Sequence, residues 1–227
     1  QTYSDSVTLG ADTTLAGTDL TLADTVDGAQ ALTLNGSGTT TFGGPVGGTT
    51  ALTSVTTDAA GDTALNGGSV TTTAAQSYSD SVTLGADTTL AGTNLSLDDT
   101  VDGGQALTLN GSGTTTLGGA VGNTNALTSL TTNAGGTTAI NGGTVETTGA
   151  QTYNDAVTLG ADTTLAGTDL TLAGTVDGGQ ALTLNGSGTT TFGGVVGGNT
   201  NLTSVTTDGS GDTAINGGAV TTTAAQT

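Results

Sequence analysis

The sequence predicts an all-β protein: a right-handed, single-stranded parallel β-helix, or β-solenoid, in which the chain winds through stacked coils. Three observations lead to this prediction. One block of sequence recurs at a fixed spacing, the apolar residues of a block fall into evenly spaced ranks, and short β-prone segments alternate with Gly- and Asn-rich turns. Repeats of a few tens of residues are typical of solenoids, where each unit stacks on its neighbour.

The repeat is 75 residues long and has no insertions or deletions. Its three tyrosines stand at equivalent positions, Tyr3, Tyr78 and Tyr153. The runs TLGADTTLAGT and ALTLNGSGTTT each occur three times at the same spacing. Because loops of a globular domain would vary in length, we expect one continuous solenoid segment over 1–227, with repeats at about 1–75, 76–150 and 151–225.

Within a block, the apolar residues form three ranks spaced by about 17 to 20 residues. The first rank is Val7, Val26, Val46, Leu65 and Val82. The second is Leu15, Leu34, Leu52, Val70 and Leu90, and the third is Leu22, Phe42, the Ala59-Ala60 region, Tyr78 and Leu97. Each rank advances four steps per block, which predicts about four coils of ~19 residues per repeat, about twelve coils in all and three short strands per coil.

The local sequence agrees with short strands and sharp corners. Leu20-Thr21-Leu22 and the runs at 31–34 and 39–42 alternate apolar and β-branched residues, which favours strands. Corners are expected at Gly-Gly pairs and at Asp27-Gly28 and Asn35-Gly36, because Gly and Asn tolerate positive φ. The charged helix formers are nearly absent, with one Glu and no Lys or Arg, and Gly is frequent, so no substantial helix is expected.

Asn-Gly between strands also favours hairpins, so an antiparallel meander is the alternative. A hairpin array does not need apolar residues that return about every 19 residues, whereas a parallel solenoid does, because like residues stack at about 4.8 Å. The period therefore favours the solenoid. Twelve coils would form a rod of about 57 Å.

The composition limits the partners of this chain. It contains no Lys, Arg, His, Cys, Met or Trp, and its formal net charge is −19. Nucleic acid and anionic lipid surfaces would be repelled, so neither is an expected partner. No apolar run approaches the ~20 residues that span a bilayer, so direct membrane insertion is not expected. The absence of Cys does not identify a redox compartment.

Blocks such as GGSVTTTAAQSYSDSVTLGADTTLAGT and ALTLNGSGTTTFGGPVGGTTALTS resemble the repeats of filamentous haemagglutinin-type adhesins. The resemblance covers the whole chain, and related β-strand repeats occur in autotransporter passengers. It implies a right-handed parallel β-helix on a very large exported bacterial protein. It implies no functional residues here, because such repeats act as a stalk and binding is often assigned to other regions.

Catalytic chemistry has few candidate groups in this sequence. The usual nucleophiles and bases, His, Cys and Lys, are absent, which leaves carboxylates, Tyr and hydroxyls. The single adjacent carboxylate pair, Asp98-Asp99, could in principle serve glycoside hydrolysis. Its equivalents are Ala23-Asp24 and Ala173-Gly174, so the pair occurs in one repeat only. We expect no enzyme and no catalytic or cofactor-binding residues.

Three sets of Asp residues recur in all blocks. They are Asp5, Asp80 and Asp155; Asp12, Asp87 and Asp162; and Asp27, Asp102 and Asp177. Stacked carboxylates could hold Ca²⁺ between coils. The favoured interpretation is that these residues occupy turns and bond their own backbone. The G-G-x-G-x-D motif of calcium-binding β-rolls is absent, so no metal site is predicted.

Two polar ladders are also expected. Thr14, Thr33, Thr53 and Thr71 would form a column of hydroxyls on one face, and a flat Thr surface is one way to bind ice. The alternative is that Thr is simply a good strand residue. Asn35, Asn110 and Asn185 would stack at corners and satisfy one another's amides.

The expected function is structural. The chain would be the stalk or fibre of a large secreted or cell-surface bacterial adhesin or matrix filament, used for surface projection, cell–cell adhesion or biofilm formation. Its location would be extracellular, and its partners would be adjacent repeats, laterally associated copies or polysaccharide. The alternative is a surface-binding module with a flat Thr-rich face for ice, mineral or polysaccharide.

Overall fold

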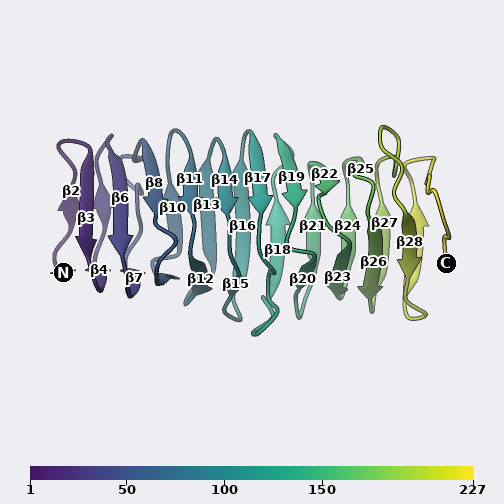
Figure 1. The fold of residues 1–227 in the computed structure, drawn as a ribbon, viewed down its shortest axis with the longest axis horizontal. Helices are drawn as coiled ribbons and strands as arrows, with labels where there is room; N and C mark the ends of the chain where they lie inside the picture. Colours follow the sequence, from purple (N-terminus) through teal and green to yellow (C-terminus); the bar gives the residue numbers. More distant parts are fainter.

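The computed structural model describes all 227 residues and contains strands but no helix. Every strand pair and isolated bridge is parallel, which rules out the antiparallel meander. The strands stack side by side along one axis, with the termini at opposite ends of a rod (Figure 1). The expected β-solenoid is therefore confirmed.

Three sheets form the faces of the rod. Face 1 comprises β1 (Thr2–Tyr3), β4 (Leu20–Leu22), β7 (Thr39–Phe42), β9 (Asp62–Leu65), β12 (Ser81–Leu84), β15 (Val101–Asp102), a bridge at Val121, β20 (Thr144–Glu146), β23 (Thr163–Gly167), β26 (Ala181–Gly186) and β28 (Ser204–Thr207). Face 2 comprises β2 (Val7–Thr8), β5 (Val26–Asp27), a bridge at Val46, β10 (Ser69–Thr71), β13 (Thr88–Gly92), β16 (Ala106–Gly111), β18 (Ser129–Thr132), β21 (Gln151–Tyr153), β24 (Leu170–Leu172), β27 (Thr189–Phe192) and β29 (Asp212–Ile215). Face 3 comprises β3 (Thr13–Gly17), β6 (Ala31–Gly36), β8 (Ser54–Thr57), β11 (Gln76–Tyr78), β14 (Leu95–Leu97), β17 (Thr114–Leu117), β19 (Thr137–Ile140), β22 (Ala156–Leu159), β25 (Val176–Asp177) and bridges at Val196 and Val220.

The number of turns differs from the expected twelve. On face 2 the inward residues stack in eleven layers: Val7, Val26, Val46, Val70, Leu90, Leu109, Thr132, Tyr153, Leu172, Phe192 and Ile215. The chain thus makes about 11 turns of 19 to 24 residues. At the ordinary strand spacing the rod is about 53 Å long.

The repeat and the turn are not commensurate. Each 75-residue block contributes eleven sides, and each turn uses three, so one block makes three and two-thirds turns. Equivalent strands of consecutive blocks therefore lie on different faces: β1, β11 and β21 belong to faces 1, 3 and 2. We number the eleven strand or bridge positions of a block in chain order and call each a kind of side. Because eleven and three share no factor, each face carries every kind of side once over three blocks.

The predicted ranks are wrong where the turns are longest. Val7, Val26 and Val46 do stack, but the next layer is Val70, whereas Leu65 lies on face 1 between Phe42 and Leu84. Turns that cross the segment 43–53 have 23 or 24 residues, because an extra loop leaves the corner there. The prediction of four ~19-residue coils per repeat assumed that a rank returns to itself after one block.

The core runs along the axis as one cluster of 40 buried apolar residues, mostly Leu and Val. Strands show the inside–outside alternation of a sheet with one buried face, as in the pattern of β6, where Leu32 and Leu34 point inward. Since neither a helix nor a second layer covers the outside, the outward side chains form the whole lateral surface of the rod.

Candidate functional site

A buried carboxylate interrupts the apolar core where the first two blocks meet. Asp80 lies in the short break between β11 and β12 and is 2% exposed. The hydroxyl of Thr57 donates to its Oδ1 at 2.6 Å, and the hydroxyl of Thr63 lies 2.8 Å from Oδ2. Both threonines belong to the preceding turn, on β8 and β9, so the cluster joins two coils.

The same cluster recurs one block later. Asp155, between β21 and β22, is buried and accepts hydrogen bonds from Thr132 at 2.7 Å and Thr138 at 2.8 Å. The cluster is thus a property of the contact between blocks. The equivalent carboxylate of the first block, Asp5, is exposed.

A second polar pair lies beside each cluster. The Tyr78 hydroxyl donates to Gln76 Oε1 at 3.0 Å, and Gln76 Nε2 donates to the carbonyls of Val70 and Ala91 at 3.0 and 2.8 Å. Tyr153 and Gln151 repeat these contacts. Burial, with a smaller contribution from the nearby Asp charges, raises the pKa of both tyrosines above its ordinary value, so they remain neutral donors.

Burial also raises the pKa of the Asp80 carboxyl, and the charge of Asp58 raises it further. The hydrogen bonds from Thr57 and Thr63 act in the opposite direction because they stabilise the charged form. Desolvation is the largest of these effects. Asp80 and Asp155 lie in breaks between strands, and Asp80 bonds its own backbone, as the turn interpretation expects. Both carboxylates nevertheless lie inside the rod, which that interpretation did not predict. The sequence pattern around them does not distinguish an inward break from an outward corner.

Asp12, Asp87 and Asp162 do occupy corners, whereas the Asp27 set ends the short strands β5, β15 and β25. Asp12, Asp87 and Asp162 each accept a backbone N–H from the next coil at 2.9 Å, donated by Ala31, Ala106 and Ala181. These contacts agree with the turn interpretation, although they join neighbouring coils instead of closing a local turn. No group of three or more acidic side chains lies close enough to hold a metal ion.

Asp27 holds the loop that lengthens the turn. Its Oδ1 accepts N–H groups from Thr49 and Thr50 at 2.9 and 2.8 Å. Asp102 and Asp177 bind the equivalent loops at Thr124-Asn125 and Asn199-Thr200. These loops are the main interruptions of an otherwise even surface, and each protrudes at a different angular position because successive blocks lie on different faces.

The predicted Thr column is correct in part. Thr14 and Thr33 are paired, but the next residue is Thr56, not Thr53, and Thr71 pairs with Ala91 on face 2. The error again arises at the long turn. A longer outward column lies on face 2: Ser69, Thr89, Thr108, Thr131, Thr152, Thr171 and Thr191.

This hydroxyl column is one residue wide. Beside it, the next outward positions on β13 and β16 are Ala91 and Asn110. The predicted Asn ladder is wrong for the same reason that the ranks were: Asn35, Asn110 and Asn185 each pair with an Ala of the preceding coil, since no block returns to its own face. They also lie within strands, one residue before the last, instead of forming the corners.

The carboxylate pair Asp98-Asp99 lies exposed at the corner between β14 and β15. Asp98 accepts a hydrogen bond from Ser96 Oγ and Asp99 from the N–H of Thr100. No cavity encloses the pair, since the structure has a single pocket and it lies elsewhere.

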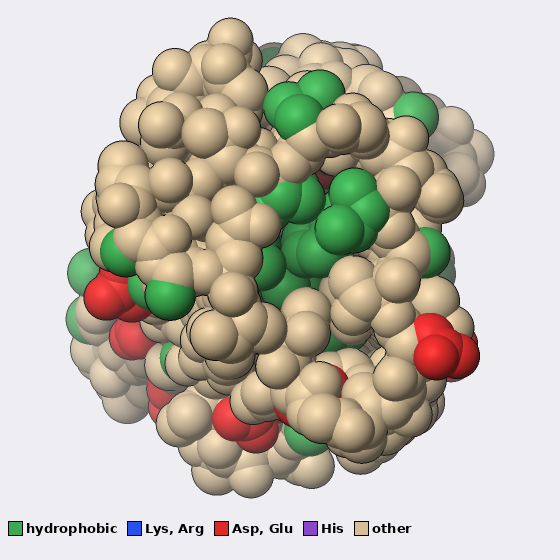
Figure 2. Space-filling view, turned by 90° about the vertical axis from the view of Figure 1, so that its right-hand side faces the viewer, with side chains coloured by type: hydrophobic (Ala, Val, Ile, Leu, Met, Phe, Trp, Pro, Cys, Tyr) green, Lys and Arg blue, Asp and Glu red, His purple; other side chains and the backbone are tan.

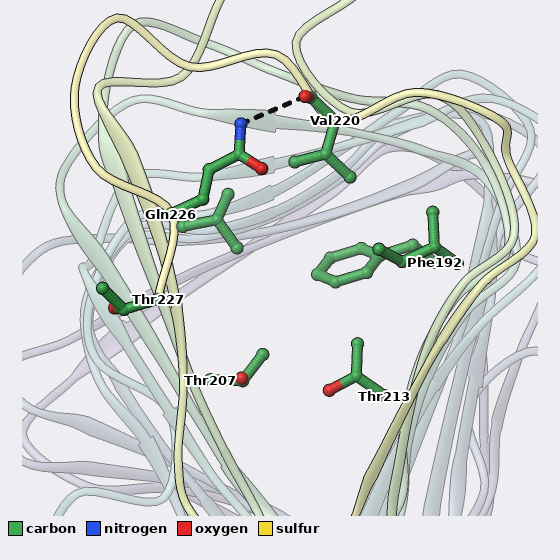
Figure 3. Close-up of a pocket in the computed structure, with 8 residues that line it drawn as sticks. Phe192, Thr207, Thr213, Val220, Gln226 and Thr227 are labelled. Carbon is green, nitrogen blue, oxygen red and sulfur yellow. Dashed lines mark hydrogen bonds between the residues drawn. The ribbon is translucent and has the colours of Figure 1, made fainter.

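That pocket is the open C-terminal end of the rod. Apolar side chains are visible through the end of the solenoid, inside a rim of backbone and polar groups, with acidic groups at the periphery (Figure 2). The hollow is lined by Phe192, Val205, Thr207, Thr213, Ile215 and Val220, among others (Figure 3). Ile215 is the most conspicuous, because it is 56% exposed and is the one large apolar side chain that is exposed.

The fold and these features define the class of protein: a three-sided parallel β-solenoid whose recurrent polar groups join its own coils. No family model, curated protein or solved structure matches the chain. The structure contains no helix long and apolar enough to cross a membrane.

Proposed function

We propose that the chain is a structural rod, the stalk or fibre segment of a large secreted or cell-surface bacterial adhesin or matrix filament. The observation that supports this most is that the recurrent polar side chains form hydrogen bonds between the coils of the rod itself. Recurrent Asp, Gln and buried Thr side chains hold one coil to the next. The buried Tyr hydroxyls bond the Gln side chains of their own strands. A rod built this way sets distance between two points, which is what a stalk requires.

The absence of a preferred face supports the same proposal. Over three blocks each face carries all eleven kinds of side, so surface features are distributed around the rod. A binding module would gain from repeating one chemistry on one face. The acidic surface, without any cation, keeps such rods soluble and separate at low salt.

The experiment is to change the number of blocks in the protein as its cells display it. Deleting residues 76–150 should shorten the projecting fibre by about 18 Å, three and two-thirds turns at ~4.8 Å each, and leave target binding by other regions intact. Electron microscopy measures the reach, and a cell-adhesion assay measures binding. Loss of binding with an unchanged reach would contradict the stalk function.

A surface-binding module is the second candidate, and the seven-residue hydroxyl column of face 2 favours it. Such a function predicts that the purified chain binds ice or an insoluble polysaccharide and that Thr131→Glu, in the middle of the column, abolishes binding. A stalk predicts no binding by either protein.

A further inference from the structure

The dipeptide Asn-Gly occurs at two places in every block of this chain. The first place is the end of a strand, at Asn35-Gly36, Asn110-Gly111 and Asn185-Gly186. The second place is a corner between strands, at Asn66-Gly67, Asn141-Gly142 and Asn216-Gly217. Because each Asn is followed by Gly, the dipeptide itself is equally reactive at both places, and only the fold can make them differ.

An Asn side chain can react with the backbone that follows it. The amide nitrogen of the next residue, once it has lost its proton, forms a bond to Cγ. The Cγ–Nδ2 bond then breaks, and the leaving nitrogen takes up a proton and departs as ammonia. Water opens the resulting imide ring at either carbonyl, which leaves Asp or isoaspartate, whose main chain runs through Cβ. Gly favours ring closure because it has no Cβ to obstruct it.

The strand pairs are held in a conformation that opposes this ring closure. Asn110 and Gly111 lie in β16 opposite Ala91 and Gly92, so both residues belong to a ladder, and Gly111 is buried. A strand side chain stands roughly perpendicular to the sheet, so turning the backbone towards it would break the ladder. The same pairing and burial hold for Asn35-Gly36 and Asn185-Gly186.

The corner pairs lie outside the ladders. Asn66 begins the short corner between β9 and β10, and its side chain is exposed and forms no hydrogen bond. Gly67 is partly exposed, and its amide N–H, which supplies the attacking nitrogen, has no hydrogen-bond partner. Gly68 follows with a φ of 76°, so two consecutive glycines allow this corner to move without disturbing a strand.

The second block repeats this corner between β19 and β20. The Asn141 side chain is exposed and forms no hydrogen bond, and Gly142 is partly exposed. The N–H groups of Asn141 and Gly142 share the carbonyl of Leu117, at 2.8 and 3.1 Å. Since the bond from Gly142 is the longer one, Asn141 should react, but more slowly than Asn66.

We propose that Asn66 and Asn141 are sites of spontaneous deamidation, where corners of the native rod are converted to aspartate and isoaspartate. The strands protect Asn35, Asn110 and Asn185 from the same reaction. The reaction needs only water and goes beyond the stalk function, because it is a property of the chain itself.

The isoaspartate product would loosen the contact between coils. It adds a carbon atom to the main chain of a corner that is packed on both sides. A Cβ atom at Gly67 would overlap the carbonyl oxygen of Gly44 in the preceding turn, and one at Gly85 in the next turn would overlap Asn66 Oδ1. A longer corner cannot keep both contacts, whereas the aspartate product keeps the length of the main chain and adds only a charge.

The test follows each site in the native chain and in the urea-unfolded chain at mildly alkaline pH, until the unfolded chain has reacted. Fragmentation mass spectrometry locates each deamidation as a gain of about 1 Da. In the unfolded chain all sites should react at similar rates. In the native rod Asn66 and Asn141 should react at least about tenfold faster than Asn35, Asn110 and Asn185, because a ladder has to open before a strand site can react.

Two results would overturn the proposal. One is an equal rate at corner and strand sites of the native rod, and the other is a native rod whose corners stay unmodified while the unfolded chain reacts. Asn66→Gln should remove the mass gain at residue 66, because Gln would have to close a larger ring. The matched control Asn110→Gln should leave the rate at Asn66 unchanged.

Melting temperatures, measured by circular dichroism after return to neutral pH, test the effect of isoaspartate. The variant with both Asn66→Asp and Asn141→Asp carries the added charges without isoaspartate, so it should melt close to the parent, and the deamidated parent should melt lower. A deamidated parent that melts like the untreated one would contradict the loosening of the corners. These outcomes leave the stalk function open, because that function is measured by reach in the displayed protein.

Discussion

The residue that most distinguishes this interior from an ordinary aliphatic core is Asp80. Removing a carboxylate from water is costly unless it is hydrogen bonded, and here two threonine hydroxyls from the preceding turn supply the bonds. Because the aliphatic ranks alone admit more than one stacking register, we infer that the Asp–Thr–Thr cluster selects the native one. Fixing the stacking register is the best-attested role of a buried polar group.

The raised pKa of Asp80 predicts how stability depends on pH. A folded-state pKa above the unfolded one means that the folded protein binds this proton more tightly, so the stabilisation is fully present below the unfolded pKa and is lost as pH rises through the folded value. The melting temperature, measured by circular dichroism, should therefore increase as the pH is lowered from neutrality towards the ordinary pKa of an Asp carboxyl.

Lowering the pH also relieves the general repulsion among the acidic side chains, and this effect raises the melting temperature as well. The comparison of Asp80→Asn with Asp99→Asn separates the two effects, because Asp99 is exposed. Asp80→Asn should flatten the pH dependence and Asp99→Asn should not. Equal slopes for both variants and the parent would show that Asp80 makes no specific contribution.

At the scale of the elements, the corners determine where each strand begins. The corner before β19 contains Gly136, whose φ of 97° lies in the left-handed region. A Cβ atom there would also overlap the carbonyl oxygen of Gly113 in the coil below. Such a corner is accessible to Gly alone, and Gly61 and Gly211 fill the equivalent positions.

Gly136→Ala should lower the free energy of unfolding by about 2 kcal/mol or more, since both the backbone conformation and the stacking would be strained. Gly179→Ala is the matched control, because a Cβ there meets nothing within 4 Å and the first block has Ala29 at this position. Chemical denaturation of both variants measures the difference. Equal stabilities would mean that this corner relaxes at little cost.

At the scale of the whole molecule, parallel backbone ladders connect each turn to the next along the rod. It contains no Lys or Arg, so trypsin has no cleavage site. Chymotrypsin has candidate sites at the aromatic residues, but Tyr78, Tyr153, Phe42 and Phe192 are all buried. Proteases need exposed, flexible chain, and here those residues lie in hydrogen-bonded strands.

We therefore expect chymotrypsin to leave residues beyond Tyr3 intact under conditions that degrade the urea-unfolded chain, as measured by mass spectrometry. The unfolded chain is the control that shows the sites to be cleavable. Rapid cleavage after Tyr78 in the native protein would show that the rod opens at the junction of the first two blocks.

The sequence predicted the fold class because the period of a solenoid appears as a regular spacing of residues along the chain. Equal spacing of Tyr3, Tyr78 and Tyr153, and the early ranks Val7–Val26–Val46 and Leu15–Leu34, were enough to establish parallel stacked coils. The corner role of Asp12 and its equivalents also followed from residue type. The inward position of Asp80 did not, because a short break between strands can turn either way.

The sequence by itself determined a repetitive, acidic, all-β rod without the usual catalytic side chains, since these properties depend on composition and period alone. Only the tertiary structure decided that a block makes three and two-thirds turns, because Leu65 and Val70 are equally good core residues and packing chooses between them. That choice places equivalent residues on different faces. It also gives three blocks eleven whole turns.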